Sequence, residues 1–146
     1  MKGDCNYLDN IRKQFDQWLS TENGQNHRYC ELLAYTPDLF ELLCLLTYEQ
    51  GVSDGSKATL SKAIAYFILP FDLIPEAVLG PAGYVDDIVI SAFALRNVIE
   101  NDGESAIHKC CKDKASNILR VIHDIDINAQ GMVGENILNL LKEKLA

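Results

Sequence analysis

Apolar side chains recur every three or four positions along most of this chain, which is the spacing of one face of an α-helix. At the start they predict an amphipathic helix near Tyr7–Ser20, followed by a polar turn over Ser20–Asn26. A short second helix contains Tyr29 and Leu33 and ends before Pro37. No segment alternates between apolar and polar residues with a period of two, so no strand is expected. The predicted fold class is all-α.

The next helix should be central, because it is apolar on most of its sides. Thr36 is a residue type that caps helices, Pro37 suits the first helical position, and Gly51 should end this helix. The helix that follows is expected to be capped by Ser53 or Ser56.

The most apolar stretch of the chain, Ala63–Leu95, is interrupted by prolines, glycines and acids. The helix that enters it should end at Leu69, because Pro70 lacks an amide hydrogen and clashes with the preceding turn. Beyond a loop, Tyr84–Asn101 is expected to form a long buried helix that the following Asp-Gly pair ends. The pattern therefore predicts helix, ordered elbow, helix at the centre of the fold.

The last third of the chain predicts two more helices. Glu104–Asp126 reads as one amphipathic helix, Asn128–Gly134 as a break, and Glu135–Leu145 as a final helix. With no linker or repeat, residues 1–146 are expected to form a single domain. It should be a bundle of about six or seven helices with a central proline-broken helical hairpin at about 61–94.

Charge narrows the class of partner. The 146 residues include 13 Lys and Arg against 21 Asp and Glu, a formal charge of −8. This acidity argues against nucleic acid and anionic lipid, and a basic protein would be attracted instead. Five cysteines without paired spacing, and a polar start without a secretory leader, predict reduced thiols and a cytoplasmic location. No apolar run reaches the roughly 20 residues that a transmembrane helix needs.

Four carboxylates lie at the elbow, those of Asp72, Glu76, Asp86 and Asp87. They are weak candidates for a Mg²⁺, Mn²⁺ or Ca²⁺ site, since these ions prefer oxygen ligands. Neighbouring helix residues point about 100° apart, so Asp86 and Asp87 are not expected to face one ion. A structural role explains the same acids: Asp72 can close the turn after Pro70, and the other pair can bind free amides at a helix start. We favour the structural role and expect no cofactor.

Other candidate chemistry is sparse. His108, Cys110 and Cys111 resemble part of a zinc site, but position 110 points away from the other two and no second ligand pair is near. His27 and His123 are isolated and are expected to be exposed. The chain has neither a GxSxG motif nor a glycine-rich phosphate loop, so no enzyme activity is predicted.

The run LPFDLIPEAVLGPAGYVDDIVI resembles the YkvA-like family, also called domain of unknown function 1232. The family pattern is P-x-D-x-I-P, a spacer, a glycine, and then D-D before an apolar helix. The resemblance covers roughly Ser61–Ala94, less than a third of the chain. It implies a structural element rather than an activity, because the family has no settled activity and also occurs beside membrane segments in some larger proteins. The residues that carry the pattern are Pro70, Asp72, Ile74, Pro75, Gly83, Asp86 and Asp87.

These observations favour a non-enzymatic acidic protein-binding module. A concrete form is a bacterial immunity or antitoxin-type inhibitor of a basic toxin such as a nuclease, since charge complementarity accelerates such association. The alternatives are a divalent-metal-dependent enzyme that uses the elbow acids and a peripheral membrane adaptor. The oligomeric state stays open. Candidate contacts for a basic partner are the acids outside the core: Asp9, Asp16, Glu22, Glu49, Asp54, Glu100, Asp102, Glu104 and Asp113.

Overall fold

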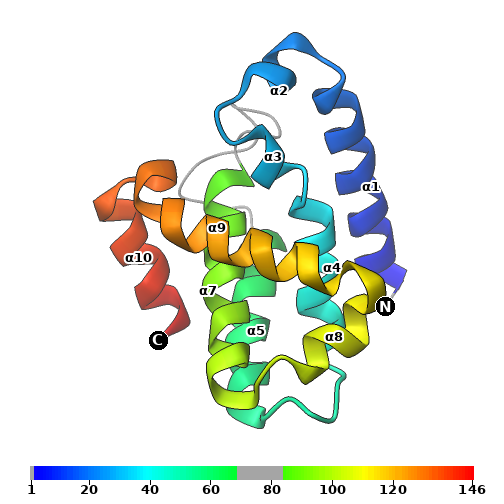
Figure 1. Cartoon of the computed structure of the whole chain (residues 1–146), viewed down its shortest axis with the longest axis vertical. Helices are drawn as coiled ribbons and strands as arrows, with labels where there is room; N and C mark the ends of the chain where they lie inside the picture. The colour runs from blue at the N-terminus through cyan, green and yellow to red at the C-terminus, as the bar shows by residue number, and fades with distance from the viewer. Residues whose placement is uncertain (1, 69–83) are drawn as a thin grey trace.

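A computed structural model describes residues 2–68 and 84–146, with side chains from residue 7 onward. Within these residues every regular element is helical, which confirms the predicted all-α fold (Figure 1). The elbow residues Pro70, Asp72, Pro75, Glu76 and Gly83 lie outside the described residues, so the proline break stays a prediction. The helices are α1 (Lys2–Leu19), α2 (Glu22–Asn26), α3 (Cys30–Leu33), α4 (Thr36–Leu46), α5 (Asp54–Ile68), α7 (Val85–Asp102), α8 (Ser105–Cys111), the 3₁₀ turn η2 (Lys112–Lys114), α9 (Ala115–Val133) and α10 (Glu135–Leu145).

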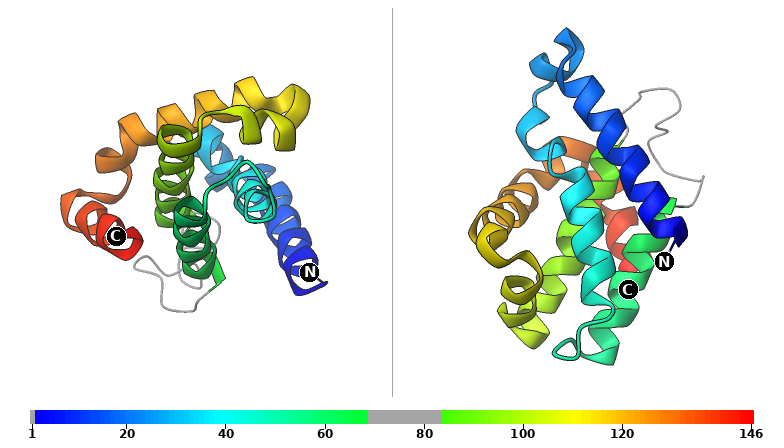
Figure 2. Two further views of the ribbon diagram at one scale, coloured as in Figure 1. Left: turned by 90° about the horizontal axis from the view of Figure 1, so that it is seen from below. Right: turned by 90° about the vertical axis from the view of Figure 1, so that its right-hand side faces the viewer.

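The helices form a row that one long helix crosses. In Figures 1 and 2, α4, α5 and α7 run side by side, and α9 lies across one face of this group. Helix α5 packs against α7, α4 packs against both, and α10 lies against α5, α7 and α9. One cluster of buried apolar side chains extends from Ile11 of α1 to Leu141 of α10. Among the helices described, none is long and apolar enough to cross a membrane.

Helix α7 is the most buried element, as its apolar circumference predicted. Ile88, Val89 and Ile90 are all 0% exposed. The helix ends at Asp102, and Gly103 follows with φ of 80°, a conformation that favours glycine. The predicted bounds of this helix are therefore correct to within a residue.

The expected polar turn at Ser20–Asn26 is wrong, because most of it forms α2. The hydroxyl of Thr21 caps this helix by accepting a hydrogen bond from the amide of Gly24 at 3.1 Å. Gly24 is buried where α2 meets α1, and a Cβ there would lie 2.0 Å from the main-chain oxygen of Trp18. A glycine is thus required for this corner to close.

The predicted cap and end of α4 also need correction. Thr36 is inside the helix rather than its cap, and its hydroxyl donates to the carbonyl of Leu33 at 2.6 Å. The helix ends at Leu46 instead of Gly51, and a turn leads to α5. Of the two serines proposed to cap α5, Ser53 does so, since its Oγ accepts from the amide of Ser56 at 3.3 Å.

The single helix predicted over Glu104–Asp126 is broken in the structure. It forms α8, η2 and α9, and the chain bends at Lys112, which has φ of 52° and ψ of −118°. The break predicted over Asn128–Gly134 is also wrong, because α9 continues to Val133 and only Gly134, with φ of 83°, interrupts it. Glu135–Leu145 forms α10 with the predicted bounds.

Candidate functional site

Two of the four elbow acids lie in the described residues, and both are buried. Asp86 and Asp87 occupy the first turn of α7 and are 0% exposed. The hydroxyl of Tyr66, on α5, donates to Oδ2 of Asp86 at 2.6 Å, and the amide of Asp87 donates to Oδ1 at 3.1 Å. The carboxyl of Asp86 therefore joins the end of α5 to the start of α7 and also binds a main-chain amide.

The structure tests only half of the candidate metal site, because it describes two of the four proposed ligands. Asp72 and Glu76 lie outside the described residues, so the four-acid arrangement stays a prediction. In residues 2–68 and 84–146, no three His, Cys, Asp or Glu side chains are grouped so that they could hold a metal ion. Both carboxyl oxygens of Asp86 accept hydrogen bonds, which is the structural role that its position at a helix start favours.

His108, Cys110 and Cys111 are not brought together with a further ligand in the described part of the chain. The ring of His108 lies on the surface with Nε2 3.6 Å from Oε1 of Glu104. The sulfur of Cys110 is 4.0 Å from Oε2 of Glu49. Burial raises the pKa of both thiols, that of Cys111 to about 11, so both are thiols rather than thiolates at neutral pH.

His27 is half-buried, contrary to the expectation that it is exposed, whereas His123 is exposed as expected. The ring of His27 lies 5.6 Å from that of Trp18, and Nδ1 accepts a hydrogen bond from the amide of Tyr29 at 3.1 Å. Burial lowers the pKa of His27. This histidine therefore helps to hold the corner between α1 and α3.

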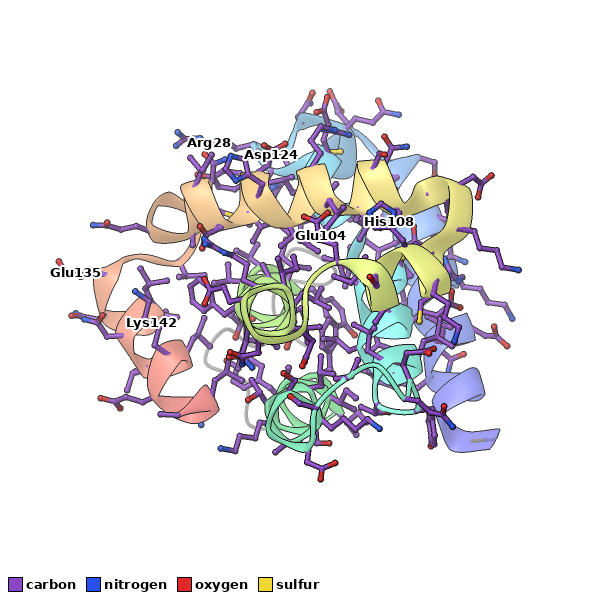
Figure 3. All side chains as sticks on the ribbon, turned by 60° about the horizontal axis from the view of Figure 1, so that its bottom comes forward. Arg28, Glu104, His108, Asp124, Glu135 and Lys142 are labelled. Atoms are coloured by element: carbon purple, nitrogen blue, oxygen red, sulfur yellow. The ribbon has the colours of Figure 1, made fainter. Side chains whose placement is uncertain are left out.

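Four of the acids proposed to bind a partner lie at one end of the bundle, and we call this region the acidic end. It consists of Glu49, Asp54, Asp102 and Glu104, where the α4–α5 connection meets the end of α7 and the start of α8. The view in Figure 3 brings this end forward. Oδ2 of Asp102 accepts hydrogen bonds from the amide and hydroxyl of Ser53 at 3.3 and 3.2 Å, so the α4–α5 connection is joined to α7.

Most of the carboxylates at the acidic end keep a negative charge that no Lys or Arg of the described residues balances. Hydrogen bonds from Ser56 and Ser53 lower the pKa of Asp102, so its carboxylate is ionised at neutral pH. The charge of Glu49 is balanced by Lys109, whose Nζ lies 2.8 Å from Oε1. In the part of the chain that the structure describes, the ion pairs of Lys and Arg do not include Asp54, Asp102 or Glu104.

The acidic end also has an exposed aromatic side chain. Tyr48, in the α4–α5 connection next to Glu49, is 69% exposed, and Leu45 on the last turn of α4 is 44% exposed. Aromatic residues such as tyrosine are enriched in protein–protein interfaces relative to the rest of the surface. The other proposed contact acids are spread over separate elements: Asp9 and Asp16 on α1, Glu22 on α2, Glu100 on α7, where it pairs with Arg96, and Asp113 on η2.

Sequence reasoning did not identify Tyr66 or Tyr48. Tyr66 is one of several large residues on an apolar helix, and nothing local links it to an acid 20 positions later. The exposure of Tyr48 could have been predicted, because this aromatic residue follows the point at which the apolar repeat of α4 ends. Both assignments depend on which elements meet in three dimensions.

Comparisons with known proteins support the resemblance. Residues 56–93 match the family model described as "Protein of unknown function (DUF1232)", so the YkvA-like resemblance is confirmed for the segment from α5 into α7. The chain is also similar to "Uncharacterized protein ORF9" of Methanothermobacter thermautotrophicus, at 26% identity over 98 residues. This similarity covers 67% of the chain and 65% of that relative, which is less than two thirds of its length. No solved structure matches the chain significantly.

Proposed function

We propose that this chain is a non-enzymatic binding module that attaches to a basic protein through the acidic end. The observation that carries the proposal is that the exposed Tyr48 lies at the same end of the bundle as acids from different elements of the fold. Tyr48 is 69% exposed, and the carboxylates of Asp54, Asp102 and Glu104 at this end of the bundle have no Lys or Arg partner in the described residues. Exposed tyrosines are frequent anchors of interfaces, and a surrounding negative rim attracts a positive partner.

Two further features support this proposal. The chain as a whole carries a formal charge of −8, which accelerates encounter with a cationic protein. The acidic end is also built on a fixed scaffold, because Asp102 binds the connection that carries Tyr48 and Glu49 binds Lys109 of α8. A surface that is ordered before binding loses less entropy when a partner docks.

The narrowest form of the proposal is an immunity or antitoxin-type inhibitor of a basic toxin such as a nuclease, acting in the cytoplasm. Its support is the charge of the acidic end. An inhibitor of this kind would lose affinity as salt rises, because the Debye length falls from about 8 Å at physiological ionic strength to about 3 Å at 1 M.

The test is affinity purification of the tagged chain from cells that express it naturally, with four versions side by side. Wild type and the charge-matched control Asp16→Lys, on α1 away from the acidic end, should recover the same basic protein in stoichiometric amount. Tyr48→Ala and Glu104→Lys should recover little of it. Recovery of no basic protein, or equal recovery by all four versions, would contradict the proposal.

A further inference from the structure

A groove between α7, α9 and α10 has a lining that is part polar and part apolar. Its volume is about 560 Å³, within the range of about 300–1,000 Å³ typical of small-molecule sites. Phe93 of α7, Ile127 of α9, and Leu138 and Leu145 of α10 contribute to its walls. Ile127 is 64% exposed, so much of its apolar surface is open to an occupant.

Two cationic side chains line the same groove, and only one of them forms ion pairs. The guanidinium of Arg96 forms ion pairs with Asp126 and with Glu100, the latter at 3.4 Å. The ammonium of Lys142 lies 5.8 Å from the centre of the Phe93 ring. In the described part of the chain, no ion pair includes Lys142. Lys142, marked on α10 in Figure 3, is therefore a cation that can pair with an anion, and it lies beside the apolar ring of Phe93.

We propose that this groove binds a monomeric carboxylate with a hydrocarbon tail, such as a medium-chain fatty acid. The carboxylate pairs with the ammonium of Lys142, and the tail covers Phe93 and the exposed part of Ile127. One ammonium suits a compact monoanion, whereas phosphate groups are usually recognised by a bidentate arginine or by several donors. The guanidinium of Arg96 is already occupied by carboxylates, so the site favours a single negative charge.

The probe is dodecanoate, titrated below its micelle concentration into the full chain and followed by calorimetry and by NMR shifts. Wild type should bind one equivalent. Lys142→Glu should weaken binding about tenfold or more, as expected for the loss of a charge-assisted contact. Ile127→Glu should weaken it similarly, and because both side chains are exposed, both variants should keep the fold by circular dichroism.

A matched control lies on the same helix. Lys144 also faces an aromatic ring, that of Tyr66 at 5.9 Å, but it does not line the groove. Lys144→Glu should therefore bind dodecanoate as wild type does. Dodecyltrimethylammonium, with the same tail and a positive head, should bind at least about tenfold more weakly than dodecanoate.

Four results would overturn the proposal. They are the absence of saturable binding, equal affinity for the two head groups, equal weakening by Lys144→Glu and Lys142→Glu, and shifts that do not include Phe93. A fifth is co-sedimentation with phosphatidylcholine vesicles that contain dodecanoate when no monomer binds. That result would assign the surface to a membrane instead of a free carboxylate.

Discussion

Replacing Tyr66 with phenylalanine tests whether its hydrogen bond to Asp86 stabilises the packing of α5 against α7. The change removes one hydroxyl from a side chain that is 5% exposed and leaves the ring in place. Its partner, Oδ2 of Asp86, is 2.6 Å away on a residue that is 0% exposed. Leaving a buried oxygen without this donor costs about 1–3 kcal/mol. We expect the free energy of unfolding to fall by about 2 kcal/mol and Tm by about 4–8 °C.

The assay is urea unfolding followed by circular dichroism, with slopes compared to confirm two-state behaviour. The matched control is Tyr48→Phe, which removes the same hydroxyl from an exposed side chain and should change stability by no more than about 0.5 kcal/mol. A double-mutant cycle with Asp86→Asn should give a coupling energy of about 1 kcal/mol. If Tyr66→Phe unfolds with the same free energy as wild type, the contact does not hold α5 to α7 and the structural role fails.

Three further changes have predictable effects on the free energy of unfolding, each measurable by the same urea assay. Gly24→Ala places a Cβ against main chain and should lower stability by about 1–3 kcal/mol, whereas Gly51→Ala, with open space around it, should not. Burial lowers the pKa of His27 in the folded chain. As the pH drops, His27 therefore becomes protonated in the unfolded chain before it does in the folded chain. The free energy of unfolding should fall as the pH drops from the pKa of the unfolded state through that of the folded state. His27→Asn should therefore flatten the stability profile between about pH 7 and pH 5, and an unchanged profile would refute this. Lys112→Gly relieves a positive φ and should raise stability by about 1 kcal/mol, while Ala58→Gly in an ordinary helix should lower it by about 1 kcal/mol.

Glycine was a reliable signal at two helix boundaries and misleading at others. Gly103 and Gly134 both have positive φ, and α7, which ends before Gly103, and α10, which begins after Gly134, have the predicted bounds to within a residue. Helix α9 also ends at Gly134 but was predicted to end at Asp126, and α4 ends well before Gly51. The break at Lys112 was missed because lysine carries no signal for positive φ and the apolar repeat continues through it. The repeat continues because Ile107 of α8 and Ile118 of α9 are buried in the same core.

The candidate site was predictable only in its local part. Asp86 and Asp87 could be placed at a helix start because acids favour that position. Their complete burial and the bond to Tyr66 depend on how α5 packs against α7, which the local pattern does not encode. The acidic end shows the same limit, since Glu49 and Glu104 are far apart in sequence, and the packing of α8 against α4 places both at one end of the bundle.

The buried first turn of α7 has a consequence for hydrogen exchange. The leading amides of a helix have no acceptor within it and usually exchange rapidly with solvent deuterium. Here the amide of Asp87 donates to a carboxylate, and Tyr84, Val85 and Asp86 beside it are at most 7% exposed. Deuterium should therefore enter this helix at its exposed carboxyl end first, and the opening that labels its start should be close to complete unfolding of the protein.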